Sequence, residues 1–322
     1  MQISRRTALR IGAAAVAAPA LARAKSPSPN LTLLKSAMAN GRFVTYQPTE
    51  LRVIGGKLTA ASVESIRADL KVLRPHFDSL ITYGAQGGAE HIPELAAEQG
   101  FRAVVMGVWD FNDKTELANA ITAARKRPEI VAGLSLGNEM ILAKRASWGD
   151  LENALDRLHV QLPTIPLTVT EPFAEFLDQA DAKPTLARMD FMLVNIHPIF
   201  ESWFHSAKPQ NWAEFVVSVT KLLAKAYPGP ILVKETGTPT APASLHFTPA
   251  MQRDFYRALE KLFPQTGACA FSYFSAFDAP WRVNDVVVGG GIHPEEAHWG
   301  LFEANRTPKP VMADIPPLPK SR

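Results

Sequence analysis

Eight short apolar runs recur along the chain, and each is bounded by turn-forming residues. β-Branched and aromatic side chains are frequent in these runs, as is typical of buried strands. The segments between them have helical periodicity: Val63, Ile66, Leu70 and Leu73, for example, share one face. The predicted strands are 43–48, 79–84, 102–109, 130–139, 165–172, 189–198, 230–237 and 268–277.

These alternating elements indicate the fold class. Strands that are apolar throughout, separated by amphipathic helices, form parallel sheets covered by helices. Eight such units at this chain length favour an α/β fold with a single (β/α)8 TIM barrel. An open doubly wound sheet would carry a Gly-rich phosphate loop after its first strand, and TYQPTE at 45–50 has no glycine. One helix should start near Asp113, because Asp113 and Glu116 stand in capping-box positions.

The first 24 residues have the three parts of a twin-arginine export signal. SRRTALR (4–10) carries the arginine pair, and the apolar stretch at 11–22 is too short to span a bilayer. ARA before Lys25 has the form of a cleavage site. We predict a signal peptide at 1–24, a flexible segment at 25–40, a catalytic barrel at 41–314 and an extended tail at 315–322. The protein would be periplasmic or secreted.

Removal of this signal changes the charge balance. The segment contains four arginines and no acidic residue, so 30 of the 34 basic residues remain against 31 acidic ones, and the net charge falls from +3 to −1. No clustered basic surface is left to bind nucleic acid. No other apolar run is long enough for a membrane span.

Two carboxylates end strands on opposite sides of the predicted barrel. Catalytic groups in TIM barrels lie at the C-terminal ends of the strands. Glu139 closes the fourth strand and Glu235 the seventh. A pair of carboxyl groups about 5–5.5 Å apart is what retaining glycoside hydrolysis needs. Glu171 also ends a strand, but Pro172 follows it and is suited to open a helix, so we interpret Glu171 as structural.

Several stretches resemble glycoside hydrolase family 17, the β-1,3-glucanases and related glucan-active enzymes. GLSLGNEM (133–140) matches the segment with the acid/base glutamate, and VKETGTPT (233–240) resembles the nucleophile segment E-T-G-[WY]-P. Further resemblances occur in the same order as in the family: ITYG (81–84), MGVWD (106–110), VNIHPIF (194–200), YFSAFDAPWR (273–282) and EEAHWGLF (295–302).

The resemblance implies a role for each matching residue. Glu139 would be the general acid/base and Glu235 the nucleophile, while Asn138 would contact the sugar near its 2-hydroxyl. Tyr83 would hydrogen-bond the nucleophile or the sugar. With the polar and aromatic residues at the strand ends, the predicted substrate-binding residues are Tyr83, Trp109, Asn138, Asn195, His197, Phe274, Phe277, Trp281, Arg282 and Glu296.

Three positions depart from the family pattern. Ile199 stands where a tyrosine is frequent, Thr238 replaces an aromatic residue, and Ala279 replaces an acidic one. Each change removes a polar or stacking group. We therefore expect altered subsites or an altered linkage preference, with both carboxylates kept.

The leading hypothesis is an exported retaining hydrolase of β-glucan, most simply β-1,3-linked, that needs no cofactor. A transglycosylase on the same scaffold would form the same intermediate. A non-catalytic periplasmic glucan-binding protein would bind without turnover. A metal-dependent barrel hydrolase is disfavoured, because the chain has no His-x-His at the first strand and no His-Glu-x-x-His motif. The oligomeric state is not predicted.

Overall fold

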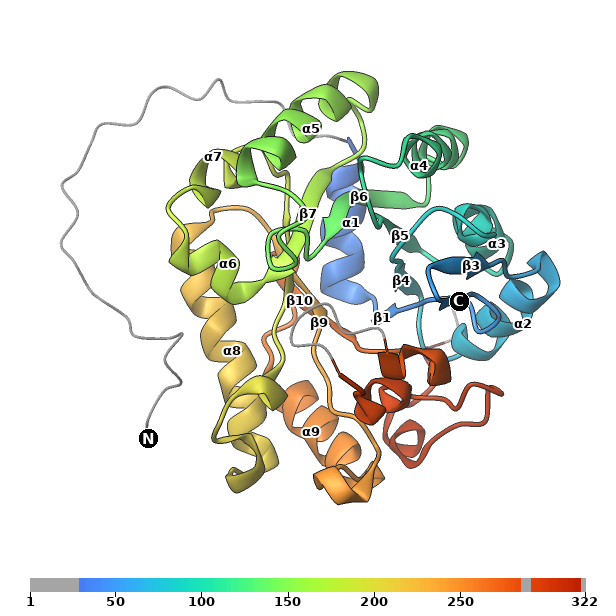
Figure 1. Cartoon of the computed structure of the whole chain (residues 1–322), viewed down its shortest axis with the longest axis vertical. Coiled ribbons are helices and arrows are strands. Elements are labelled where there is room, and N and C mark those ends of the chain that lie inside the picture. The colour runs from blue at the N-terminus through green and yellow to red at the C-terminus, as the bar shows by residue number, and fades with distance from the viewer. Residues whose placement is uncertain (1–28, 285–290, 320–322) are drawn as a thin grey trace, which may run out of the picture.

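Eight parallel strands close into a barrel in the order of the chain (Figure 1). The computed structural model describes residues 29–284 and 291–319, so the predicted signal peptide lies outside the described residues. The barrel strands are β1 (Phe43–Thr45), β4 (Ser79–Ile81), β5 (Ala103–Val108), β6 (Val131–Asn138), β7 (Leu167–Pro172), β8 (Met192–Asn195), β9 (Ile231–Glu235) and β10 (Cys269–Tyr273). Strand β10 pairs with β1 and closes the barrel. Each strand lies within one predicted run, so the predicted single (β/α)8 barrel is confirmed.

Helices cover the outside of the barrel (Figure 1). They are α2 (Val63–Leu73), α3 (Ile92–Glu98), α4 (Lys114–Lys126), α5 (Trp148–Gln161), α6 (Phe173–Asp178), α7 (Ala182–Leu186), α8 (Pro209–Ala226) and α9 (Pro249–Leu262). Short 3-10 helices lie in the connections: η1 (Ala89–His91), η2 (Pro198–Phe200), η3 (Phe204–Ser206), η4 (Ala243–Leu245), η5 (Pro280–Asn284), η6 (Pro294–His298) and η7 (Pro310–Asp314). Among the described residues, no helix is long and apolar enough to cross a membrane.

The predicted capping box of α4 is only half formed. The Asp113 carboxylate accepts hydrogen bonds from the backbone N–H groups of Thr115 and Glu116, as an N-cap does. The side chain of Glu116, however, does not return to the cap. It accepts hydrogen bonds from three backbone N–H groups of the loops at the barrel mouth instead.

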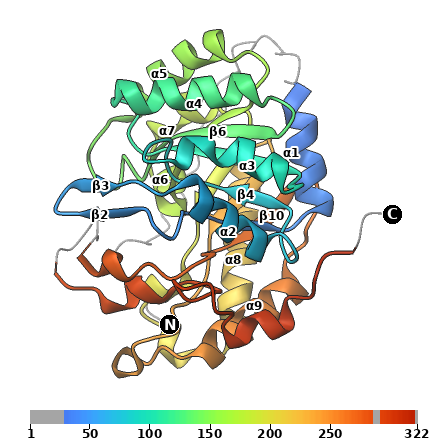
Figure 2. The same ribbon diagram turned by 90° about the vertical axis from the view of Figure 1, so that its right-hand side faces the viewer.

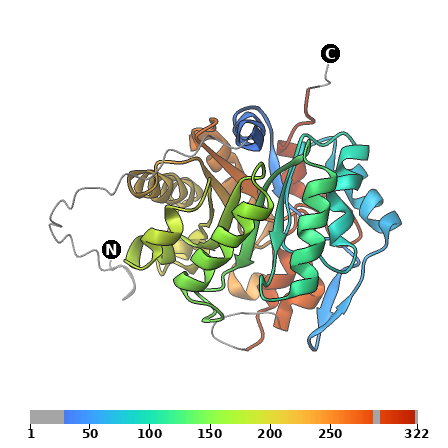
Figure 3. The ribbon, with the colours of Figure 1, turned by 90° about the horizontal axis from the view of Figure 1, so that it is seen from above.

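A helix replaces most of the segment predicted to be flexible at 25–40. Helix α1 (Pro29–Asn40) buries Leu34, Ala37 and Met38 completely, and they pack against the side chains inside the barrel. This spacing places the three residues on one helix face, and the Pro- and Ser-rich start of the segment hid the pattern. Figure 3 shows α1 at one end of the barrel, opposite a projecting β-hairpin.

That hairpin, β2 (Arg52–Ile54) and β3 (Lys57–Thr59), was not predicted. Gly55 and Gly56 form its turn with φ of 56° and 74°, a conformation that glycine adopts without strain. The two strands are exposed, and β2 contacts η5. Figure 2 shows the hairpin projecting from the barrel. The hairpin therefore extends the barrel on the side where the strands end.

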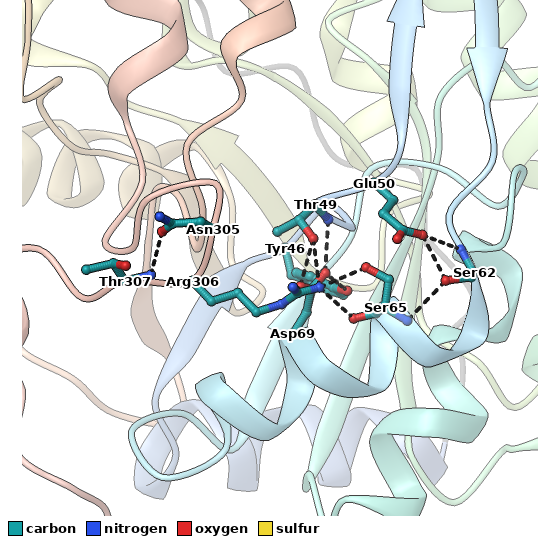
Figure 4. Close-up of polar contacts among 9 residues, drawn as sticks. All are labelled: Tyr46, Thr49, Glu50, Ser62, Ser65, Asp69, Asn305, Arg306 and Thr307. Atoms are coloured by element: carbon teal, nitrogen blue, oxygen red, sulfur yellow. Dashed lines mark hydrogen bonds and ion pairs between the residues drawn. The ribbon is translucent and has the colours of Figure 1, made fainter.

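A buried carboxylate fixes the base of the hairpin (Figure 4). Asp69 in α2 is fully buried and accepts hydrogen bonds from the Tyr46 hydroxyl (2.8 Å), from the backbone N–H of Thr49 (2.9 Å) and from Arg306 Nε (2.7 Å). Arg306 also donates to Ser65 Oγ at 2.8 Å. This cluster links β1, α2 and the C-terminal segment, so it holds three parts of the chain that are distant in sequence.

We expect Asp69→Ala to lower the free energy of unfolding by about 3 kcal/mol, because it removes the carboxylate that pairs with Arg306 and leaves the buried Tyr46 hydroxyl without its acceptor. Urea unfolding measures the change. The control is Glu98→Ala, which breaks an exposed pair with Arg67 whose side chains are 43% and 45% accessible. That loss should stay within about 1 kcal/mol. Equal losses for the two variants would contradict the role given to Asp69.

The described part of the C-terminal tail has no helix or strand after η7. The carbonyl oxygen of Pro316 accepts a hydrogen bond from Arg42, and the backbone N–H of Leu318 donates to Pro75. These contacts attach the tail to the end of the barrel where α1 lies.

Candidate active site

Glu139 and Glu235 border the same cavity, of about 330 Å³, at the C-terminal ends of the strands. Glu139 directly follows β6, and Glu235 is the last residue of β9. Glu139 has a left-handed backbone with φ of 51°, which is uncommon for a residue with a side chain and is frequent at functional sites. The structure thus places the two predicted carboxylates at one cavity.

A side-chain amide donates a hydrogen bond to Glu139. Asn195 Nδ2, at the end of β8, donates to Glu139 Oε1 at 2.8 Å. Burial raises the pKa of Glu139 and the charge of Glu235 raises it further, against the Asn195 hydrogen bond and the nearby charges of His197 and Lys234. The environment therefore favours the protonated form of Glu139.

Glu235 is surrounded by cationic and donor groups. His197 Nε2 lies 3.2 Å from Glu235 Oε2, and Lys234 Nζ lies 3.6 Å from Oε1. Burial by itself would raise the pKa of Glu235. The His197 hydrogen bond and the charges of Lys234 and Arg282 outweigh it and lower the pKa to about 2. The surroundings of Glu235 therefore favour its ionised form.

Five of the predicted substrate-binding residues line the cavity with the two glutamates. They are Tyr83, Trp109, Asn138, Trp281 and Arg282. Aromatic and apolar surface dominates the walls, and the hairpin contributes Val53 and Leu58. Flat apolar walls with a few polar groups suit a sugar, whose ring faces are apolar and whose edges carry hydroxyls.

The other five predicted residues do not line the cavity. Asn195 contacts Glu139, and His197 contacts Glu235. The ring of Phe274 packs edge-on against His197 at 5.2 Å, and Arg282 lies over it. Glu296 pairs with Arg282 at 3.3 Å. Phe277 packs against Tyr46. These three predicted residues can shape the wall or hold Arg282, and none of them is part of the cavity lining.

Two polar residues call for separate comment. The Tyr83 hydroxyl is buried beside Glu235, and burial together with the Glu235 charge raises its pKa. The predicted hydrogen bond of Tyr83 to the nucleophile or the sugar stays a prediction. Thr238, one of the departures from the family pattern, is fully buried and does not line the cavity. Its backbone carbonyl accepts a hydrogen bond from Gln252, so Thr238 belongs to the packing under α9.

Two further glutamates hold the loops of the site: Glu116, which was predicted only as part of a capping box, and Glu171, which was interpreted as structural. Glu116 accepts hydrogen bonds from the backbone N–H groups of Ala85, Trp109 and Asp110 at 2.8–3.0 Å. Glu116 thereby joins the loops after β4 and β5 and positions Trp109.

Glu171, at the end of β7, has a similar function next to the acid/base candidate. It accepts from the backbone N–H groups of Ile141 and Leu142, at 2.8 and 3.2 Å, just after Glu139. This contact fits the structural interpretation of Glu171. Burial raises the pKa of Glu171 to about 8, although the two backbone N–H groups act to lower it.

Lys234 is a residue of the site that was not predicted, although the sequence signals it. It interrupts an apolar strand directly before Glu235. Its side chain is 2% exposed, and its ammonium group donates to Asn138 Oδ1 at 2.5 Å. A lysine in a buried strand is unusual enough to be noticed from sequence, but its partner comes from a strand almost a hundred residues away.

Metal-ligating side chains are not gathered at this site. In the described ranges, no group of three or more His, Cys, Asp or Glu residues is arranged to hold a metal ion. The polar groups that face the cavity are instead carboxyl, amide, hydroxyl and guanidinium groups.

Comparison with known proteins adds independent findings. A family model described as the BtgE/BtgC glycoside hydrolase domain matches residues 44–300. A curated glucan 1,3-beta-glucosidase from Arthroderma benhamiae is 24% identical over an alignment of 257 residues that covers 75% of this chain and 82% of the relative.

Solved structures share the fold. The glycoside hydrolase family 17 beta-1,3-glucanosyltransferase from Rhizomucor miehei has a TM-score of 0.65 at 20% identity, over 86% of this chain and 97% of that one. A beta-glucuronidase from an uncultured Clostridium sp. has a TM-score of 0.61 at 15% identity, over 86% of this chain and 49% of that one. Together with the family match, these findings confirm the family-17-like assignment that the motifs predict.

Proposed function

The chain belongs to the BtgE/BtgC glycoside hydrolase family, and from this premise we propose that it cleaves β-1,3-linked glucan with retention of configuration. Family membership makes the protein a glycoside hydrolase, an enzyme rather than a binding protein without turnover. The β-glucan substrate is supported by the curated glucan 1,3-beta-glucosidase, a relative over most of the chain.

The observation that carries this proposal is the contrast between two carboxyl groups at one cavity. Burial and the charge of Glu235 favour a protonated Glu139, whereas His197 and Lys234 favour an ionised Glu235. Carboxyl groups whose environments separate their pKa values in this way are suited to divide the acid and nucleophile roles.

The proposed reaction has two displacements. Glu139 protonates the glycosidic oxygen while the Glu235 carboxylate attacks the anomeric carbon, which releases the leaving sugar and forms a glycosyl ester on Glu235. Glu139, now ionised, then takes a proton from water, and the water oxygen attacks the same carbon and frees Glu235. The two inversions give a product with the β configuration of the substrate.

A panel of glucans tests the substrate. The purified protein is incubated with β-1,3-, β-1,6-, β-1,2- and mixed-linkage glucans, with Glu235→Ala as the control. Release of reducing sugar from the β-1,3-glucan, and none by the variant, is expected. Turnover of another linkage with none of β-1,3 would refute the linkage, and equal release by the variant would refute the role of Glu235.

Transfer is the second candidate, because the Rhizomucor miehei structure of the same fold is a beta-1,3-glucanosyltransferase. Hydrolysis and transfer share the glycosyl ester and differ in whether water or a sugar hydroxyl attacks it. Chromatography of the products from a single purified oligosaccharide distinguishes them. Products longer than the substrate would show transfer, and shorter products alone would show hydrolysis.

The pH dependence of kcat/KM follows from the two carboxyl groups. Glu235 must be ionised, so kcat/KM falls on the acidic side only as the pH approaches the Glu235 pKa of about 2. Glu139 must be protonated, so activity is lost as the pH rises through a pKa that lies above the ordinary 4.5. We expect a bell shape with a steep loss on the basic side. A profile that stays flat from about pH 4 to 8 would contradict the assignment.

We also propose that the enzyme is exported. The twin-arginine pattern at 4–10 and the small-residue site before Lys25 support a periplasmic or secreted enzyme. The mature protein would begin at Lys25. An N-terminal sequence that still starts at Met1 in the exported fraction would contradict the signal.

A further inference from the structure

The side chain of Lys234 points into the interior of the barrel, near the C-terminal ends of the strands. Leu232, two residues earlier on β9, belongs to the group of side chains packed inside the barrel. Residues two apart on a strand face the same side, so the side chain of Lys234 faces inward as well. Its ammonium group makes three contacts there: Asn138 Oδ1 at 2.5 Å, Glu235 Oε1 at 3.6 Å and the face of the Tyr83 ring at 4.2 Å.

The contact with Asn138 decides which way that amide faces. An ammonium group has three donors and no acceptor, so it can approach only the carbonyl oxygen of the amide. The NH2 group of Asn138 is therefore turned away from Lys234. Asn138 also lines the cavity that the two glutamates border. Its NH2 group is left as a donor for the oxygen of a sugar hydroxyl.

The contact with Glu235 concerns charge. A buried ammonium group is costly unless a carboxylate lies beside it. One ionised carboxylate balances one ammonium group, and here Glu235 is the nearer of the two glutamates. Lys234 therefore stabilises the ionised form of Glu235 more than that of Glu139, which lies farther from it.

We propose that Lys234 is a positioning residue for the reaction: it fixes the Asn138 amide as a donor to the substrate and holds the Glu235 carboxylate in place for attack. This inference rests on the proposed function of the two glutamates. Lys234 does not line the cavity, so it acts through Asn138 and Glu235 and not by touching the sugar.

The direct test is Lys234→Met, which keeps most of the side-chain length and removes the charge and the donors. We expect kcat to fall roughly tenfold to a hundredfold with a smaller change in KM, because the lost hydrogen bonds are charge-assisted. The acidic limb of kcat/KM should also move to higher pH, because loss of a nearby positive charge raises the pKa of Glu235.

Several other groups act on this pH profile and stay in place in the variant. The titratable and charged groups around Lys234 are Glu235 on its own strand, Glu139 after β6, Tyr83 after β4, His197 after β8 and Arg282 in η5. His197 and Arg282 still lower the pKa of Glu235, so the acidic limb should shift without reaching the value of an ordinary glutamate.

Lys309→Met is the matched control. Lys309 is also buried, and its ammonium group pairs with Asp278 at 2.7 Å, outside the cavity lining. Loss of that pair should lower stability and leave the pH profile and kcat of the folded enzyme unchanged. If both lysine variants change only stability, the role of Lys234 is structural and the inference is wrong.

A double-mutant cycle tests the link to Asn138. If Lys234 acts partly through the Asn138 amide, Lys234→Met should reduce kcat less in an Asn138→Ala background than in the wild type. Equal factors in both backgrounds would overturn the link. If Lys234→Met does not fold, Lys234→Arg, which keeps the charge, replaces it in the test. The acidic limb of the kcat/KM profile of Lys234→Arg should stay near that of the wild type. A shift as large as that expected for Lys234→Met would overturn the charge role.

Different results would refute the proposed function and the role of Lys234. A wild type without turnover of β-glucan, or a fully active Glu235→Gln variant, would refute the proposed function itself. A wild type that depends on both glutamates, together with a Lys234→Met variant of unchanged kcat and pH profile, would refute only the role of Lys234.

Discussion

Glu235→Gln should reduce kcat by at least about 10⁴-fold, because the variant cannot form the glycosyl ester on which both displacements depend. The amide is nearly the same size as the carboxylate, so the cavity should keep its shape. Binding of a β-1,3-linked oligosaccharide, measured by calorimetry, should therefore survive while turnover is lost.

Control variants separate chemistry from folding. Glu214 is exposed on the surface of α8, so Glu214→Gln should keep wild-type kcat. Glu235→Gln should match it in its circular dichroism spectrum. A folded Glu235→Gln variant with more than about a tenth of wild-type kcat would rule out Glu235 as the nucleophile.

Glu139→Gln should show a loss that depends on the leaving group. With a glucan, kcat should fall by about 10²–10⁴-fold, because the departing sugar oxygen needs a proton. With an aryl glycoside of an acidic phenol, the first displacement needs no protonation, so the glycosyl ester forms and accumulates. The measurement is kcat for both substrates, together with the size of the initial burst.

Azide provides a second readout for the same variant. It is a nucleophile that needs no general base, so it should restore turnover of the aryl glycoside by Glu139→Gln and yield the β-glycosyl azide. Glu235→Gln forms no glycosyl ester and should not give this product. Equal losses on both substrates, with no effect of azide, would contradict the acid/base role of Glu139.

The strands of the barrel could be predicted because each of them is buried on both faces. A run such as 231–233 is apolar without interruption, and this signal does not depend on the rest of the chain. Glu139 and Glu235 could be found for a related reason. A barrel brings the C-terminal ends of all its strands to one mouth, so the strand boundaries alone place both residues there.

The parts that were missed depend on tertiary contacts or on short elements. The hairpin strands have three residues each, too few for a periodic pattern, although Gly55-Gly56 marked the turn. Helix α1 is stabilised by the end of the barrel, which the local sequence does not reveal. The functions of Glu116 and Lys234 depend on partners from other loops and strands, and no spacing within the chain predicts those contacts.

Trapping the covalent intermediate tests the central claim most directly. A 2-deoxy-2-fluoro glycoside of a β-1,3-linked disaccharide with an activated leaving group slows the second displacement, so the glycosyl ester accumulates. The protein is digested and the peptides are analysed by mass spectrometry. We predict one fluoroglycosyl group, attached to Glu235 in the peptide that contains ILVKETGTP. Attachment to another residue, or turnover without an adduct and with an α-configured first product, would contradict the two-glutamate mechanism.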